Sequence, residues 1–202
     1  MEEKIIDTNT GIRKGLYYFC IDVESVGLYG NPFAVAYVIY NNDGFIMDKH
    51  LEYCPIDTNN CLESDLKWIK ENVLPHFKDV NYTCDNVSEL CNNFWNRWID
   101  ANKRYEIVVM IGDVIYPVET NFISRCIQFD LKNRQFSGPY PFCDISSVEN
   151  CISPQRFKEL KEYESNLLKH YPEHNPMNDA ERCGLKWLFI KNDLENPYNK
   201  TY

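Results

Sequence analysis

The chain has 202 residues, of which 44% are hydrophobic, 25% charged and 14% aromatic, and its formal net charge is −9. This length fits one domain with a substantial core, and the composition argues against wholesale disorder. No apolar run reaches the ~18 residues of a membrane span, and the acidic N-terminus lacks the apolar segment of a signal peptide, so we expect no membrane association. The 30 acidic against 21 basic residues exclude a broadly electropositive nucleic-acid binder, but not a nucleic-acid enzyme whose site needs carboxylates.

The nine cysteines include no Cys-x-x-Cys pair, and the closest spacings are those of Cys54 with Cys61 and of Cys84 with Cys91. Zinc sites normally use tighter pairs, and disulfides are rare where no secretion signal exists. We therefore expect free structural thiols, and a location in the cytoplasm or another reducing compartment.

Three apolar runs near the N-terminus each predict a strand. A polar segment, residues 1–15, precedes them and is expected to be a flexible lead-in. The runs cover residues 16–23, 33–40 and 45–53. The turn-forming residues 41–44 (Asn-Asn-Asp-Gly) separate the last two, so the three strands are expected to form an antiparallel meander.

The rest of the chain alternates between helical and strand patterns. Apolar residues at helical spacing, or a proline at a helix start, predict helices over 64–77, 87–99, 117–127, 153–168 and 176–190. Continuous apolar character predicts a strand buried on both faces over 105–111 and a short strand over 142–148. The order predicts an α/β domain over 16–191, in which a mixed sheet of three antiparallel strands and then parallel strands is covered by helices. A polar tail over 192–202 is expected to be irregular.

Asp22 and Glu24 end the first predicted strand. Because side chains two residues apart on a strand point to the same face, these two carboxylates should lie side by side and repel each other unless a cation lies between them. Hard ions such as Mg²⁺ take carboxylate oxygens at about 2.0–2.1 Å. The plain alternative is a solvated strand end, where Asp-x-Glu is common.

Two further groups of polar residues lie at helix starts. His174 precedes the helix start Asn175-Pro176, which places Asp179 in the first turns, so a loop imidazole and a helix carboxylate could meet at one site. Asp113 and Glu119 flank the passage from the fourth strand to a helix, where α/β sheets place functional loops. In the alternative interpretation His174 is a surface residue, Asp113 a turn residue, and Glu119 an acid favoured by the helix dipole.

Together these groups resemble the three motifs of the DEDDh (DnaQ-like) 3′→5′ exonucleases, which belong to the ribonuclease H-like superfamily. Residues 22–28 are similar to the first motif, including its glycine, Gly27, and the following Leu28 resembles oligoribonuclease-type members. Residues 143–147 look like the strand that those members carry before their late helices, and residues 174–180 match the third motif closely. The resemblance covers roughly residues 16–190.

The second motif departs from the family pattern. Its register places Glu119 at the position of the family's aspartate, with Phe122 and Ile123 as the apolar pair and Asp113 at a small polar position. Alternatively Asp113 is the ligand and Glu119 a helix-start acid, because the loop is about one residue longer than usual. We expect both acids to line the site, with either as the ligand.

The resemblance implies phosphodiester hydrolysis with two ions, Mg²⁺ or Mn²⁺, about 3.5–4 Å apart. It implies that Asp22 bridges both ions, that Glu24 and Asp179 hold one, and that Asp113 or Glu119 holds the other.

The family match also implies the roles of the remaining site residues and the substrate. His174 would be the general base, since imidazole changes charge near neutral pH. Leu28 would pack against the terminal bases, and the backbone at Gly27 would let the 3′ end approach. The expected substrate is the 3′ end of a single strand, with RNA favoured, held in part by scattered bases: Arg125, Lys132 and Arg134.

The expected product is a nucleoside 5′-monophosphate. The alternatives are a DNA 3′→5′ exonuclease and a catalytically silent ribonuclease H-like binding module. The oligoribonuclease likeness also allows a homodimer.

Overall fold

The computed structural model describes residues 11–59 and 61–195 and contains a five-stranded mixed sheet. The strand order is β3-β2-β1-β4-β5, in which β1 pairs antiparallel with β2 and parallel with β4, while β3 is antiparallel to β2 and β5 parallel to β4. The strands are β1 (Arg13–Ser25), β2 (Pro32–Asn41), β3 (Ile46–Tyr53), β4 (Tyr105–Gly112) and β5 (Phe142–Asp144). The predicted α/β class and the antiparallel meander are confirmed, and the arrangement is compatible with a ribonuclease H-like sheet.

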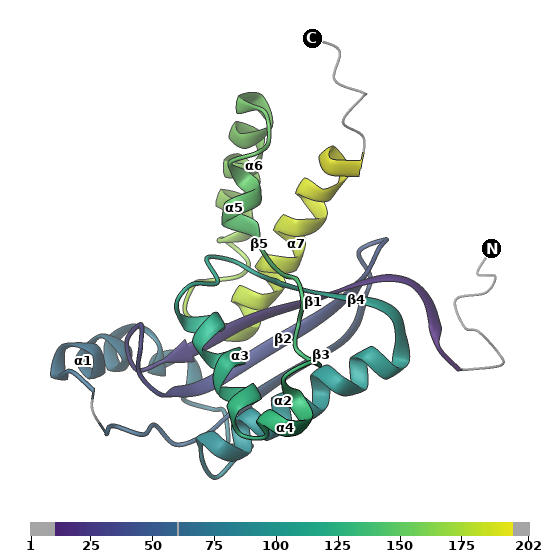
Figure 1. Ribbon diagram of the computed structural model, residues 1–202. Coiled ribbons are helices and arrows are strands. Elements are labelled where there is room, and N and C mark those ends of the chain that lie inside the picture. The colour runs from purple at the N-terminus through teal and green to yellow at the C-terminus, as the bar shows by residue number, and fades with distance from the viewer. Residues whose placement is uncertain (1–10, 60, 196–202) are drawn as a thin grey trace.

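Helices cover both faces of this sheet (Figure 1). They are α1 (Glu63–Asn72), a 3-10 turn η1 (Leu74–Phe77), α2 (Val87–Arg104), α3 (Val118–Gln128), α4 (Leu131–Arg134), α5 (Ile145–Glu149), α6 (Pro154–Leu167) and α7 (Pro176–Glu195). The helices α2 and α3 pack on one face, and α7 packs on β1 and β2 from the other face with α6 beside it. Of the helices described, none has the length and apolar character needed to cross a membrane.

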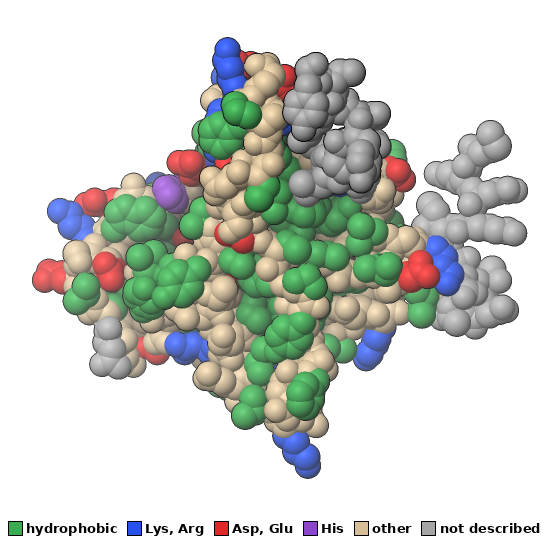
Figure 2. Space-filling view, turned by 45° about the horizontal axis from the view of Figure 1, so that its top comes forward, with side chains coloured by type: hydrophobic (Ala, Val, Ile, Leu, Met, Phe, Trp, Pro, Cys, Tyr) green, Lys and Arg blue, Asp and Glu red, His purple; other side chains and the backbone are tan. Residues whose placement is uncertain are grey.

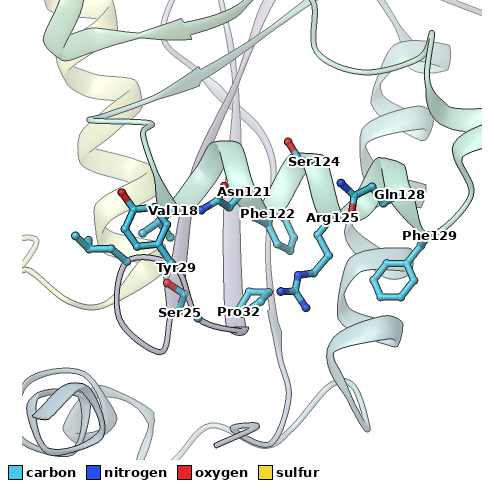
Figure 3. A pocket seen from close by; sticks show the side chains of 12 residues that line it. Ser25, Tyr29, Pro32, Val118, Asn121, Phe122, Ser124, Arg125, Gln128 and Phe129 are labelled. Carbon is cyan, nitrogen blue, oxygen red and sulfur yellow. The ribbon is translucent and has the colours of Figure 1, made fainter. Parts of the chain in front are cut away.

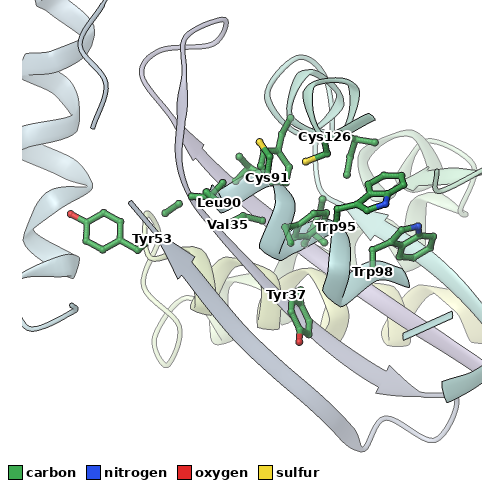
Figure 4. Close-up of a cluster of buried hydrophobic side chains, with 14 of the residues drawn as sticks. Val35, Tyr37, Tyr53, Leu90, Cys91, Trp95, Trp98 and Cys126 are labelled. Atoms are coloured by element: carbon green, nitrogen blue, oxygen red, sulfur yellow. The ribbon is translucent and has the colours of Figure 1, made fainter. Parts of the chain in front are cut away.

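The alternation of side chains along β1 divides the core into two layers. Phe19 belongs to the layer under α2, where its ring meets the edge of Trp98 with 5.5 Å between ring centroids. Figure 4 shows this layer, with Trp95 and Trp98 of α2 packed over the strands. Tyr18 and Cys20 belong to the opposite layer, under α7. Asp22 and Glu24 have the same parity as Cys20, so they continue the row that faces α7.

Two strand predictions are wrong in detail. The strand β4 is not buried on both faces over its whole length, because Glu106 and Ile107 are exposed where α7 does not cover them. The fifth strand ends at Asp144, and residues 145–149 form α5 instead. In α5 the Ser146 hydroxyl donates a hydrogen bond to Asp113, and the Ser147 hydroxyl donates one to Asp144. The predicted extended strand did not include these contacts.

Helix and domain boundaries also differ from the sequence predictions. The predicted helix over 64–77 breaks after Asn72 because Pro75, which lacks a backbone N–H, allows only the short turn η1. Strand β1 begins at Arg13, within the expected lead-in, and α7 continues into the expected tail as far as Glu195. The remainder of both predictions, for residues 1–10 and 196–202, lies outside the described residues.

Candidate functional site

Asp22, Glu24 and Asp179 each offer a carboxylate oxygen, and these oxygens lie within 4.8 Å of one another. Two of the acids end the row of β1 that faces α7, and the third lies in the first turn of α7. One step further into the fold, the thiols of Cys20 and Cys183 are hydrogen-bonded across the same interface. The two elements thus bring together acids that are more than 150 residues apart in the chain.

Glu119 adds a fourth carboxylate from the first turn of α3. The pairing of β1 with β4 ends at Cys20 and Ile111, so the following residues of β1 have no strand on that side. The backbone amide of Val23 donates a hydrogen bond to the Glu119 carboxylate there, and Glu119 is only 6% exposed. Glu119 therefore lies against β1 between the positions of Asp22 and Glu24.

The electrostatics of this group are dominated by burial and by repulsion among its acids. Burial raises the pKa of Glu24 to about 8, of Glu119 to about 7 and of Asp179 to about 6. Burial, and then repulsion by Asp179, Glu24 and Glu119, raises the pKa of Asp22 well above its usual value. A bound divalent cation would reverse this repulsion, and an all-carboxylate donor set suits Mg²⁺ or Mn²⁺. The residues present therefore fit such an ion.

Arg182 is a cation beside this group. Its role was not predicted from the sequence. Its guanidinium forms an ion pair with Asp179, three residues earlier on the same face of α7, and lies 3.8 Å from Glu173. It lowers the pKa of Asp179 and of Asp22 against the effect of burial. The spacing of Asp179 and Arg182 was the available signal, but three-residue pairs are common on helices.

His174 lies on the loop before α7 in a left-handed backbone conformation, with φ of 63°. Its ring meets the edge of the Trp68 ring from α1, with 5.0 Å between centroids. Hydrogen bonds from the backbone amides of His174 and Asn175 lower the pKa of Asp179. The loop that carries the imidazole is thus tied to a carboxylate of the candidate site. The contact with Trp68 was missed because nothing local connects the two segments.

Asp113 has different partners from Glu119. One of its oxygens accepts a hydrogen bond from Ser146 Oγ at 2.9 Å, and the other lies 2.6 Å from Lys186 Nζ. Lys186 is 8% exposed and also lies 2.8 Å from Glu149 and 2.5 Å from Glu164. Within the described ranges, the cluster suited to a metal comprises Asp22, Glu24 and Asp179 and does not include Asp113.

Asp144 orders the loop between β4 and α3. One carboxylate oxygen accepts a hydrogen bond from the Val114 amide at 3.0 Å, and the other accepts from Ser147 Oγ at 2.6 Å. Val114 has φ of 56°, which is unfavourable for a β-branched residue. Such strain persists where surrounding structure over-determines it, and it concentrates at functional sites.

Gly27 and Leu28 lie on the β1–β2 loop next to Glu24. Gly27 has φ of 67°, a left-handed conformation that favours glycine, and a Cβ there would lie 2.2 Å from Asp65 Oδ2, so the Asp65 side chain would have to move. Leu28 is 61% exposed at the rim of a hollow of about 320 Å³ that begins at Glu24. The hollow is lined by Val23, Glu24, Ser25, Gly27, Leu28, Asp65, Trp68 and Val118.

Large apolar side chains are exposed on the two loops near the site, the β1–β2 loop and the loop between β4 and α3. Leu28, Tyr29, Val114 and Tyr116 are each at least 61% exposed. Figure 2 shows a face on which hydrophobic side chains form much of the central surface, with charged groups mainly toward its edges. Exposed apolar groups of this kind mark binding surfaces, and the two tyrosine rings among them offer faces on which flat ring systems can stack.

A comparison of the chain with models of known protein families finds no matching family, and a comparison with curated proteins finds no matching sequence. The functional assignment therefore depends on the geometry of the carboxylates and on the motif resemblance.

Proposed function

We propose that this chain is a divalent-metal-dependent 3′→5′ exonuclease that acts on single-stranded nucleic acid, with RNA as the favoured substrate. The observation that carries the proposal is the meeting of Asp22, Glu24 and Asp179 within 4.8 Å, with Glu119 buried beside them. These four positions follow the order of the three DEDDh motifs, and the second motif departs from the family pattern in having Glu119 at the aspartate position. An acidic cluster alone would not distinguish this activity from others. The presence of His174 and its spacing from Asp179 are what favour this activity.

The metal would be held by Asp22, Glu24 and Asp179, with Glu119 as the second-motif ligand in preference to Asp113. Glu119 faces the same stretch of β1 as the other acids, whereas Asp113 is paired with Lys186. A divalent ion bound there supplies charge neutralisation for the terminal phosphate and its developing negative charge.

His174 is proposed to take the proton from the attacking water. The water oxygen forms a bond to phosphorus as the bond from phosphorus to the O3′ of the preceding nucleotide breaks. The leaving oxygen gains a proton from solvent, so the products are a nucleoside 5′-monophosphate and a strand one nucleotide shorter. Trp68 packs against the imidazole and limits its orientation, which general-base catalysis requires.

The test is incubation of the protein with Mn²⁺ and end-labelled single-stranded RNA or DNA. Stepwise shortening from the 3′ end is expected, faster on RNA, and Asp22→Ala should abolish it. Asp43→Ala is the matched control, because Asp43 is an exposed acid in the β2–β3 turn. This variant should retain full activity.

The other outcomes separate the alternatives. Faster loss on DNA would reassign the substrate, and shortening that survives in Asp22→Ala would identify a contaminant. If labelled strands bind but none is shortened by the wild-type protein, the chain is a silent binding module and the exonuclease proposal fails.

We also propose a reducing compartment as the protein's location. All nine cysteines are free thiols, and six of them are buried. Burial raises the pKa of Cys54 to about 12 and of Cys84 to about 11, so these thiols are poor nucleophiles and suit a packing role.

A further inference from the structure

A second hollow, of about 620 Å³, lies between the β1–β2 loop and α3 (Figure 3). Its lining residues are Ser25, Leu28, Tyr29, Gly30, Pro32, Val118, Asn121, Phe122, Ser124, Arg125, Gln128 and Phe129. It shares Ser25, Leu28 and Val118 with the hollow that begins at Glu24. The two hollows thus meet at a ridge that includes the exposed Leu28, and the second has about twice the volume of the first.

The charge of this hollow is opposite to that of the chain. The protein has 30 acidic residues, yet among the side chains that the structure describes no acid lines the hollow, and Arg125 is the one charged group that does. Within residues 11–59 and 61–191, no carboxylate pairs with the Arg125 guanidinium. In Figure 3 this side chain extends from α3 toward Pro32, across the hollow. A phosphate in the hollow would therefore meet an uncompensated cation.

Aromatic rings lie at the two ends of the hollow. Figure 3 shows Tyr29 at one end and Phe129 at the other, and they are 70% and 45% exposed. The phenol group of Tyr29 is hydrogen-bonded to that of Tyr116, which connects the β1–β2 loop to the loop before α3. Rings alternating with a cation in a groove are the features with which proteins bind single strands, because bases stack and phosphates pair.

Between the rings of Tyr29 and Phe129 the hollow is lined by polar side chains, and buried residues pack beneath them. Asn121, Ser124 and Gln128 are exposed on α3 and can donate or accept hydrogen bonds. Phe122 and Pro32 are buried and support the hollow, so it exists without rearrangement. A site on a rigid helix and a supported loop loses little entropy on binding.

We propose that this hollow binds the nucleotides that precede the 3′-terminal nucleotide of a single strand. Arg125 contacts a backbone phosphate, while Tyr29 and Phe129 stack on bases. The direction of the strand rests on the proposed function, because cleavage at the carboxylates requires the terminal nucleotide to lie beside Glu24, in the first hollow. Since the second hollow is about twice as large, the preferred substrate is a strand of three or more nucleotides rather than a dinucleotide.

Binding of a 5′-fluorescein-labelled hexauridylate, measured by fluorescence anisotropy in EDTA, tests the hollow separately from catalysis. Arg125→Ala should weaken binding about tenfold and reduce the slope of log K against log salt by about 0.7, the value for one phosphate of a single strand. Phe129→Ala should weaken binding about tenfold with no change of that slope. Lys103→Ala, an exposed cation of α2 outside the hollow, is the matched control and should bind as the wild type does.

Hydrolysis in Mn²⁺ then tests the length preference. Arg125→Ala should lower kcat/KM for the hexanucleotide about tenfold and lower that for a dinucleotide far less, because a dinucleotide has no phosphodiester upstream of its first nucleotide for Arg125 to contact. An equal loss of kcat/KM on the hexanucleotide and the dinucleotide, or no loss on either substrate, overturns the inference even if the wild type is an active exonuclease. Binding that depends on Arg125 without hydrolysis by the wild type would instead retain the hollow and refute the exonuclease proposal.

A second copy of the chain is the competing occupant. Sedimentation of the wild type and of Phe129→Ala distinguishes it, because a strand-binding hollow predicts the same mass for both. A smaller mass for the variant, with unchanged strand binding, would overturn the inference in favour of a dimer interface. Circular dichroism and melting temperature confirm that both variants are folded.

Discussion

Lys186 Nζ lies 2.6 Å from Asp113 Oδ2, in an ion pair whose ammonium group is almost completely buried. Ser146 donates to the other oxygen of Asp113, so this carboxylate is satisfied by protein partners. Glu119 instead lies against β1 and contributes to the repulsion that raises the pKa of Asp22 and Glu24. The two acids of the second motif therefore have different surroundings, although the sequence alone left either of them as the ligand.

Separate substitutions of Glu119 and Asp113 should have opposite effects: the first should lower activity, and the second should lower stability. Glu119→Gln removes a ligand charge and should lower the rate of mononucleotide release at least about a hundredfold, because metal ions contribute several kcal/mol of charge stabilisation. Its melting temperature without metal should not fall, since one repelling charge is gone. Asp113→Asn should retain most activity but lose stability, by about 1–3 kcal/mol, because Lys186 loses a charged partner.

Rates of release and urea unfolding of the two variants check this assignment. Equal loss of activity in both would mean that the segment between β4 and α3 has been assigned incorrectly. Loss of activity in Asp113→Asn alone would make Asp113 the ligand.

The metal-free protein should become less stable as the pH rises through neutrality. Burial raises the folded-state pKa values of Glu24, Glu119 and Asp179 to about 8, 7 and 6, from ordinary values of 4.5, 4.5 and 3.8. Between about pH 4 and pH 8 the folded state thus binds more protons at these groups than the unfolded chain does. The free energy of unfolding therefore falls with rising pH in this window.

Mn²⁺ should reverse this loss, most strongly at pH 8, where the ligands are easiest to deprotonate. Ion at 100 times its dissociation constant stabilises the folded state by about 2.7 kcal/mol, which corresponds to a rise in melting temperature of roughly 5–10 °C. Glu24→Gln should be more stable than the wild type in EDTA at pH 8 and should show little response to Mn²⁺. Scanning calorimetry with and without EDTA measures both effects, and a wild-type melting temperature indifferent to Mn²⁺ would refute the metal site.

Much of the fold followed from local pattern. The alternation of side chains placed Asp22 and Glu24 on one face of a strand, and the start signal Asn175-Pro176 placed Asp179 in the first turn of a helix. Both are properties of short segments, and the structure confirms both. The meeting of β1 with α7 could be expected only from the family resemblance, because it depends on packing between distant segments.

The parts that the sequence could not predict are contacts between segments. The ring of Trp68, on α1, contacts the ring of His174. Lys186 forms ion pairs with acids from three other segments. Of the three bases expected to contact substrate, Arg134 is instead bonded to the Cys126 carbonyl and to Asn92. Neither periodicity nor composition distinguishes such an arginine from a free one.

His174→Asn should separate proton transfer from metal binding. Asparagine adopts the left-handed backbone region readily, so the loop with φ of 63° should be retained. Loss of the general base should lower the rate about 10²–10⁴-fold, while the rise in melting temperature with Mn²⁺ remains. His170→Asn, at an exposed position of the same loop, is the control and should be fully active. A His174→Asn variant with normal rates would remove the imidazole from the mechanism.

Gly27→Ala should damage the β1–β2 loop, whereas Gly44→Ala should not. Both glycines have positive φ, of 67° and 89°, so alanine incurs a similar backbone cost of about 1–2 kcal/mol at each position. At Gly27 the new Cβ would also lie 2.2 Å from Asp65 Oδ2, whereas at Gly44 its nearest neighbour is Leu188 Cδ1 at 3.4 Å. Gly27→Ala should therefore lose more stability in urea unfolding, and it should also lose activity because Leu28 shifts.

The double variant Gly27→Ala with Asp65→Ala identifies the cause. Removing the Asp65 carboxylate opens space for the new Cβ, so stability should return to the level of Gly44→Ala, while the backbone cost remains. Activity should recover in part, because Leu28 can return to the ridge between the two hollows. If the double variant is as unstable as the sum of the two single changes, the sites are independent, and the close approach of Asp65 to Gly27 does not explain the requirement for glycine.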